Sequence, residues 1–143
     1  MRKKQDIGIS RGGKNTKIHA VVDGLGLPIR LIFTSGEVHD STQTISLLNG
    51  FDISNSAVIG DKANANTEIV TYISKHGGKV VIPPKSNTKN PWDCDYNHYK
   101  ERHLVECFFN KIKHYRRIAT RYDKLSSMFQ AFVYLASIVL WLR

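Results

Sequence analysis

One predicted helix gathers a carboxylate, two cations and an aromatic ring on a single face. At about 100° per residue, a stripe roughly 60° wide holds all four side chains. They are Tyr99, Arg102, Glu106 and Lys113. A carboxylate beside basic and aromatic groups is a candidate functional group. Arg102 and Glu106 also have the four-residue spacing of an ion pair on a solvated helix, so this face alone fits either interpretation.

A second carboxylate directly follows a short apolar strand. Asp61 comes immediately after residues 57–60, which are apolar and end in glycine. Open sheets with parallel strands place their functional sites just outside the carboxyl ends of those strands. Asp61 is therefore a second candidate, although an aspartate in such a position is equally suited to capping a turn or a helix.

Apolar runs predict the elements that position these groups. Residues 17–23 and 27–34 are rich in Val, Ile and Leu, and the turn-forming Asp23-Gly24-Leu25-Gly26 sequence between them predicts a β-hairpin. A short helix is expected over residues 40–48, with the side-chain oxygens of residues 40–42 capping its first turn. A strand, a helix and a strand are then predicted over residues 57–60, 67–75 and 79–82.

The strand–helix–strand segment has the lengths of a βαβ unit, whose two strands should be parallel. Together with the hairpin it predicts an α/β fold with one mixed sheet. The helix that begins near Tyr99 should pack on that sheet through its opposite face, formed by Leu104, Val105, Phe108 and Ile112. A last helix is expected from about residue 124 to 142.

The composition is basic and fits one domain. The 143 residues include 21 Lys and Arg against 12 Asp and Glu, a net charge of +9 and a pI near 9.7. Such a charge favours a nucleic-acid partner, because phosphate neutralisation attracts DNA whatever its sequence, but a basic surface alone would show the same balance. Residues 1–16 are polar and glycine-rich, and we expect them to be a flexible basic arm or linker.

Neither export nor membrane insertion is expected. Cys94 and Cys107 form no disulfide or zinc pattern, and no apolar run follows the basic residues at the start of the chain. Residues 129–142 are strongly apolar but shorter than the ~20 residues of a membrane span. They are expected to form a buried terminal helix.

The spacing of Tyr99, Arg102, Glu106 and Lys113 resembles the signature helix of the Asp-Asp-Glu transposases of the insertion sequence five family. Other segments resemble the same family in the same order along nearly the whole chain. They are residues 10–13, 17–20, 36–41, 59–63, 81–87 and 116–124. Their succession makes the resemblance specific and assigns residues 17–143 to part of a transposase catalytic domain.

The resemblance implies a ribonuclease-H-like fold, a mixed sheet flanked by helices, and three carboxylates that hold two divalent ions, Mg²⁺ or Mn²⁺. One ion activates the attacking oxygen and the other stabilises the departing oxygen, and such hard ions prefer carboxylate ligands. By this resemblance Asp61 is the second catalytic carboxylate and metal ligand, and Glu106 is the third. Tyr99, Arg102 and Lys113 are implied to hold the DNA backbone.

Two departures from the family pattern bear on activity. The first catalytic aspartate of the family lies on the first strand of the fold, in a short Asp-Ser-Thr sequence, and this chain is expected to begin after that strand. Asp6, Asp23 and Asp40 are expected in an arm, a turn and a helix cap, so none is a good substitute. Asn64 stands where the family commonly has an aromatic residue. The site is therefore expected to be incomplete and the chain alone inactive.

Cations and aromatic residues alternate after the signature helix. Arg116, Arg117 and Arg121 lie among Tyr115 and Tyr122, a composition suited to following a phosphate backbone. A solvated turn between two helices would show the same composition. These arginines are therefore candidate DNA-binding residues.

Two main functions stay open. One is a transposase that cleaves and rejoins DNA at insertion-sequence ends by two-metal phosphoryl transfer, here as a truncated or second-frame product. The other is a catalytically inactive DNA-binding remnant that occupies the element's ends; a general nuclease on the same fold is a third, weaker option. The transposase would bind double-stranded DNA, both terminal repeats and target, as a homo-oligomer in the nucleoid of the bacterial cytoplasm. Loss of the first strand would leave neighbouring strands unpaired and favour association.

Overall fold

The computed structural model describes residues 8–10, 13–119 and 126–143. The chain divides into two compact units. The first comprises Met1–Val38 and Leu104–Arg143, and the second comprises His39–His103. Each unit has a hydrophobic core of its own.

The first unit is built on an antiparallel hairpin. β2 (Gly13–Val22) pairs with β3 (Pro28–Ser35). Asp23 closes the turn between them, because its Oδ1 atom accepts hydrogen bonds from the backbone N–H groups of Leu25 at 2.9 Å and Leu27 at 3.0 Å. The predicted hairpin and its turn are confirmed.

Strand structure extends further toward the N-terminus than the sequence indicates. β1 (Gly8–Ser10) pairs antiparallel with the beginning of β2, with Gly8 opposite Asn15. Residues 8–10 and 13–16, expected to belong to a flexible arm, therefore form strands. Backbone pairing between the two segments holds this polar stretch extended, which apolar periodicity cannot predict.

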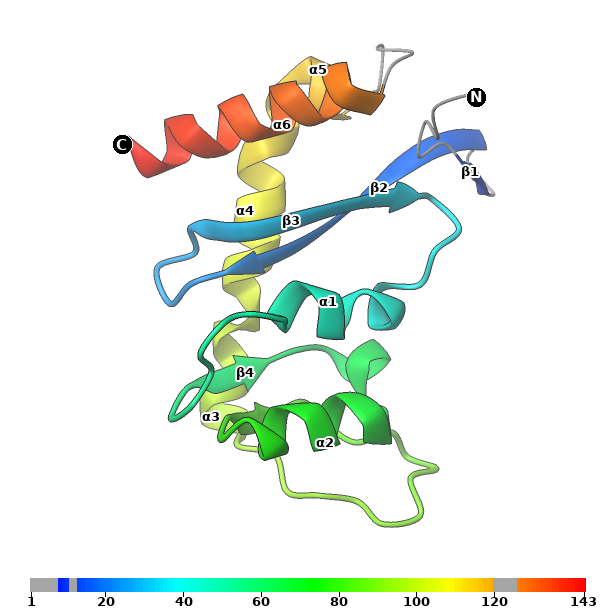
Figure 1. Cartoon of the computed structure of the whole chain (residues 1–143), viewed down its shortest axis with the longest axis vertical. Helices are drawn as coiled ribbons and strands as arrows, with labels where there is room; N and C mark the ends of the chain where they lie inside the picture. Colours follow the sequence, from blue (N-terminus) through cyan, green and yellow to red (C-terminus); the bar gives the residue numbers. More distant parts are fainter. Residues whose placement is uncertain (1–7, 11–12, 120–125) are drawn as a thin grey trace. The chain divides into compact units, whose positions relative to one another are not determined.

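Three helices share a core with the hairpin (Figure 1). They are α4 (His103–Lys113), α5 (Arg116–Ala119) and α6 (Ser126–Trp141). Their buried side chains are Phe108, Ile112, Ile118, Phe129, Val133 and Ala136, which pack with Ile18, Ala20, Val22, Leu31 and Phe33. Alternate residues of β2 thus face the helices, as expected for a strand with one covered face. The indole N–H of Trp141 donates to the Pro28 carbonyl at 2.8 Å and fastens α6 to the start of β3.

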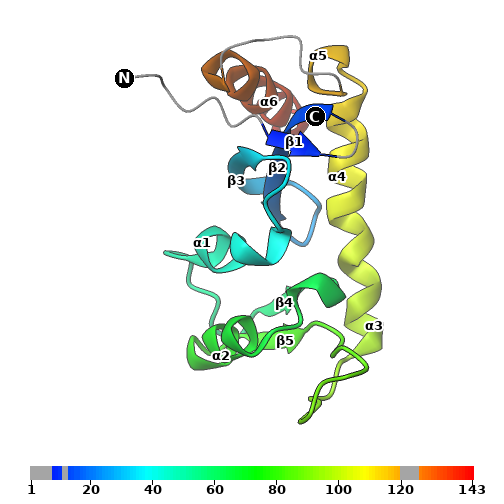
Figure 2. The ribbon, with the colours of Figure 1, turned by 90° about the vertical axis from the view of Figure 1, so that its right-hand side faces the viewer.

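The second unit contains the predicted βαβ segment. β4 (Ala57–Ile59) and β5 (Lys79–Val81) are parallel, and α2 (Thr67–Lys75) connects them. The side chain of Asn66 caps the first turn of α2, and Gly77, with φ of 76°, ends the helix in the left-handed region that glycine tolerates. α2 and α3 lie on opposite sides of the β4–β5 pair (Figure 2). The prediction of a parallel βαβ unit is confirmed.

The helix predicted over residues 40–48 consists of two short segments, η1 (Asp40–Thr42) and α1 (Thr44–Leu48). Neither begins with a side-chain cap, so the predicted capping is wrong. The Thr42 hydroxyl instead donates to the His39 carbonyl at 2.7 Å. The hydroxyl thus satisfies a carbonyl rather than the free N–H groups of the first turn.

The described strands form two separate sheets. One has the order β1-β2-β3 and the other pairs β4 with β5. The α/β architecture is confirmed, but the expectation of one mixed sheet is wrong for the described residues. No described strand forms backbone hydrogen bonds with strands of both sheets, so the described strands do not join into one sheet.

Asp95 ties the next helical segment, α3 (Tyr96–Tyr99), to β5. Its Oδ1 atom caps the helix by accepting from the backbone N–H groups of Asn97 and His98 at 3.1 and 3.2 Å. Its Oδ2 atom accepts from Lys79 Nζ at 2.8 Å. The bond from Lys79, followed by the backbone bonds, lowers the pKa of the Asp95 carboxyl from 3.8 to about 2.

Asp95→Asn should destabilise the chain in a pH-dependent way. Because the pKa is lower in the folded state, the contribution of the carboxylate is fully present above about pH 4 and is lost as the pH falls toward about 2. The difference in urea midpoint between variant and wild type should be constant from neutral pH down to about pH 4 and shrink below it. Asp93→Asn, which removes the same charge from an exposed neighbour, is the control. A difference that stays constant through the acid range would contradict the prediction.

Candidate active site

Asp61 lies just beyond the carboxyl end of β4. The N–H of Gly60 donates to the Val81 carbonyl at 3.2 Å and continues the pairing with β5 one residue past the strand. Asp61 then caps η2 (Lys62–Asn64), since its Oδ1 atom accepts from the Ala63 N–H at 3.1 Å. The structure places Asp61 at the predicted position and also gives it the capping role that was the alternative.

Asn64 is a direct partner of Asp61. Its amide nitrogen donates to Asp61 Oδ1 at 2.9 Å, and its amide oxygen accepts from the Thr44 hydroxyl. An amide can do both because it has a donor and an acceptor, whereas a phenyl ring at this position could do neither. The sequence identified Asn64 only as a departure from the family pattern. The bridge that Asn64 makes between Asp61 and Thr44 was missed, because Thr44 lies 20 residues away from Asn64 in the chain.

The second oxygen of Asp61 is available to a ligand. Both hydrogen bonds end on Oδ1, and no described residue donates to Oδ2. The side chain is half-buried, so this oxygen belongs to a partly enclosed carboxylate with one oxygen already oriented. Carboxylate oxygen is the ligand that Mg²⁺ and Mn²⁺ prefer. The geometry of Asp61 is therefore compatible with metal binding.

Tyr99 and Arg102 contact each other within the second unit. Tyr99 is the last residue of α3, and Arg102 ends η3 (Lys100–Arg102). The guanidinium carbon of Arg102 lies 5.6 Å from the centroid of the Tyr99 ring, a cation–π distance. Tyr96 packs edge-on against Tyr99 with centroids 6.1 Å apart. The aromatic contact restrains the arginine side chain.

Glu106 and Lys113 lie on the exposed side of α4, in the first unit. On the other side of the same helix, Phe108 and Ile112 are completely buried. The predicted division of this helix into a polar and an apolar face is confirmed for α4. Asp61 belongs to the second unit and Glu106 to the first.

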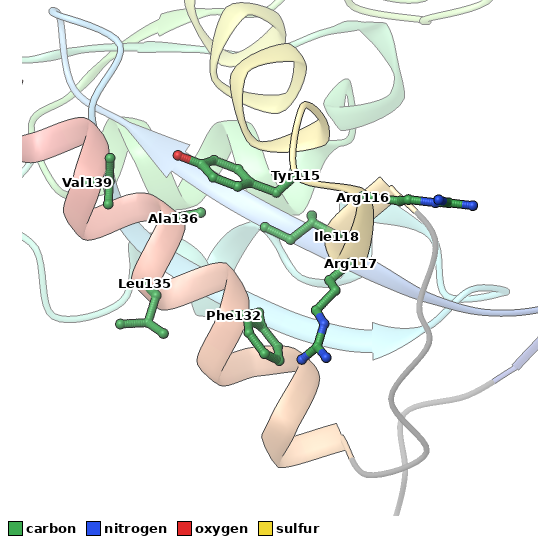
Figure 3. Close-up of a pocket in the computed structure, with 8 residues that line it drawn as sticks. All are labelled: Tyr115, Arg116, Arg117, Ile118, Phe132, Leu135, Ala136 and Val139. Carbon is green, nitrogen blue, oxygen red and sulfur yellow. The ribbon is translucent and has the colours of Figure 1, made fainter.

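The basic run after α4 is described in part. Arg116 and Arg117 are exposed residues at the beginning of α5. Arg117 extends over the ring of Phe132 in α6, 4.4 Å from its centroid, whereas Arg116 points away from α6 (Figure 3). Arg121 lies outside the described residues. Arg117 thus contributes to packing within the first unit as well as to the positive surface.

No group of three His, Cys, Asp or Glu side chains that could hold a metal ion occurs within residues 8–10, 13–119 and 126–143. Asp23 is engaged in the hairpin turn, and Asp40 begins η1. Asp6 lies outside the described residues. Asp61 and Glu106 are thus two candidate ligands without a described third.

Comparison with known proteins identifies the family. The family model described as the transposase DDE domain matches residues 2–142. A protein of Brucella ovis named "Putative transposase for insertion sequence element IS6501" is 41% identical over 131 residues, which cover 90% of this chain and 98% of the relative. No solved structure gives a significant match. Since the match includes both units and nearly every residue, this chain belongs to the family of transposases with a DDE domain.

Proposed function

We propose that this chain acts in the metal-dependent cleavage and rejoining of DNA at the ends of an insertion sequence. Asp61 and Glu106 serve as metal ligands in this proposal. The observation that carries it is the Asp61 carboxylate beyond β4, which has Oδ1 fixed by two donors and Oδ2 left for a ligand. The match to the transposase DDE domain supports the assignment.

Each part of the candidate site has a distinct task. Mg²⁺ or Mn²⁺, when bound, would supply activation of the attacking oxygen and stabilisation of the departing one. Ala63 and Asn64 hold the Asp61 carboxylate in a single orientation. For Glu106 the support is its position in the signature spacing and its exposure on α4.

The DNA backbone is the proposed partner of the basic groups. Arg102, restrained against Tyr99, can make a forked contact with a phosphate, and Lys113 can act as a point charge. Arg116, Arg117 and Arg121 extend this positive surface, and the net charge of +9 supports a double-stranded DNA partner. The partner DNA would be the terminal repeats and the target, in the nucleoid of the bacterial cytoplasm.

The finer assignments rest on the order of the motifs. The spacing of Tyr99, Arg102, Glu106 and Lys113 supports membership of the insertion sequence five family. The order of hairpin, short helix and parallel β4–β5 pair supports a ribonuclease-H-like fold. A truncated or second-frame product of such an element would need a third carboxylate from outside the described residues, and alone would cut DNA weakly or not at all.

DNA binding without cleavage is the second candidate. The observation that favours it is that the described part of the chain offers no group of three metal-binding side chains. Such a protein would occupy the ends of the element through its basic surface and would not require a divalent ion. The two candidates differ in what happens when the carboxylates are removed.

Where the wild type nicks a supercoiled plasmid that carries the element ends in the presence of Mn²⁺, Asp61→Asn and Glu106→Gln should each lower that nicking by on the order of 100-fold or more, because each removes a proposed metal ligand. Asp93→Asn and Glu101→Gln are matched controls that remove the same charges from exposed positions. DNA affinity, and its decrease with salt, should persist in all four variants. Nicking that survives both ligand substitutions would refute the assignment, and binding without nicking by the wild type would favour the second candidate.

Asn64→Ala should weaken Mn²⁺ binding by roughly tenfold, because Asp61 loses an orienting donor. Titration of Mn²⁺ followed by electron paramagnetic resonance measures this directly and does not require catalysis. Asn97→Ala, at an exposed position of α3, should leave the affinity unchanged. An unchanged affinity in Asn64→Ala would mean that the hydrogen bond does not prepare Asp61 for metal.

A further inference from the structure

α6, expected from the sequence to be a buried helix, is covered on one face only. Its inner face packs in the core of the first unit, where Val133 is fully buried. Its outer face leaves Leu135 and Ile138 exposed, at 57% and 52%. None of the described helices has the length and apolarity needed to cross a bilayer. Part of the outer face borders a recess beside α5.

This recess between α5 and α6 is open, has a volume of about 330 Å³ and lies within the first unit (Figure 3). Ile118 and Ala136 are buried and form its floor, and its walls include the rings of Tyr115 and Phe132 and the side chain of Val139. Such a lining recognises flat ring systems by stacking and apolar contact rather than by hydrogen bonds. The volume is at the lower end of the ~300–1,000 Å³ range of ligand pockets, so it suits a single ring system.

Two arginines stand at the rim of the recess. The guanidinium carbon of Arg117 lies 4.4 Å from the centroid of the Phe132 ring, and Arg116 points away from α6 (Figure 3). A guanidinium that stacks through its face presents its N–H groups along its edge, which is the geometry that binds phosphate. The surrounding chain is basic, since residues 107–143 contain seven Lys and Arg against one Asp, a net charge of +6. The recess thus joins an apolar floor to a positive rim.

We propose that this recess binds one unstacked base of a DNA strand. The base lies over Ile118 and Ala136, against the rings of Tyr115 and Phe132, and Arg117 pairs with the adjoining phosphate. The inference rests on the proposed function, which makes DNA the partner, and adds which part of the DNA is bound at α5 and α6.

The lining distinguishes an unstacked base from intact duplex. In a duplex, neighbouring bases cover the base faces, and the surface presents phosphates, sugars and polar base edges. An apolar recess gains little from those groups, whereas the face of an extruded base stacks on aromatic rings. A nucleotide joins such a flat face to a negative charge, so it matches both the floor and the rim. Bases that are already unpaired cost least to place there, so the recess should prefer single strands to duplex.

Two DNA strands of equal charge test the proposal. One is a labelled oligothymidylate of about 12 nucleotides, and the other is a strand of the same length that carries no bases. The affinity of the full chain for each is measured by fluorescence anisotropy in EDTA. The wild type should bind the thymidylate roughly tenfold more tightly than the abasic strand, because only the thymidylate has bases to stack. Phe132→Leu should bring this ratio close to one. Tyr134→Leu, which removes an exposed ring of α6 outside the recess, should keep it.

A second pair of variants tests the same site even if Phe132→Leu fails to fold. Val139→Glu places a negative charge on the wall of the recess. Ile138→Glu places the same charge on the neighbouring residue, which is exposed and does not line the recess. Both variants should lose similar affinity for the abasic strand, because both lower the net charge equally. Only Val139→Glu should also lower the ratio between the two strands.

The measurement separates this inference from the proposed function. EDTA removes divalent ions, so a failure of metal-dependent cleavage would not change the ratio. Salt-dependent binding of both strands with a ratio near one would overturn the base site and leave DNA as the partner. Failure to bind either strand or the duplex element ends would refute the DNA partner and the base site together. A ratio that neither Phe132→Leu nor Val139→Glu changes would overturn the site, as would binding to anionic phospholipid vesicles without any base preference.

Discussion

The parallel pairing of β4 with β5 is the constraint on which the candidate site depends. Each of the two strands is only three residues long, so their pairing depends on packing against the connecting helix α2. The buried side chains Ile69 and Ile73 of α2 shield the strands from solvent. The ladder continues through Gly60, and the chain then leaves the sheet at its carboxyl edge. Asp61 lies at that edge because it is the first residue after the last backbone pair between β4 and β5.

The apolar core sets the positions of the polar groups, and hydrogen bonds then fix their orientations. Asn64 bridges Asp61 to α1 through Thr44, and Asp95 joins the beginning of the signature helix to β5 through Lys79. Both bridges connect segments that are distant in sequence. The exposed polar side of α4 has a different basis, since its residues face solvent because Phe108 and Ile112 hold the other side of the helix in the core.

Local patterns predicted the elements that have strong periodicity or turn chemistry. The hairpin around Asp23 and the helix Thr67–Lys75 were predicted because the apolar pattern and the turn-forming or glycine residues agree there. Residues 8–10 and 13–16 were assigned to an arm because their extended form depends on pairing between them and not on apolar alternation. The single mixed sheet was expected from strand direction alone, and direction does not say which strands share hydrogen bonds.

The sequence by itself determined the chemical types at the candidate site, the order of the elements and the two faces of the signature helix. Those properties depend on residue type and on separations of a few residues, which helix and strand geometry convert directly into position. Only the tertiary structure decided that Asn64 joins Asp61 to Thr44, that Arg117 lies over Phe132, and that large apolar side chains of α6 stay exposed. These features depend on packing and rotamers. The sequence alone does not show whether an apolar side chain is covered by its own core or by another molecule.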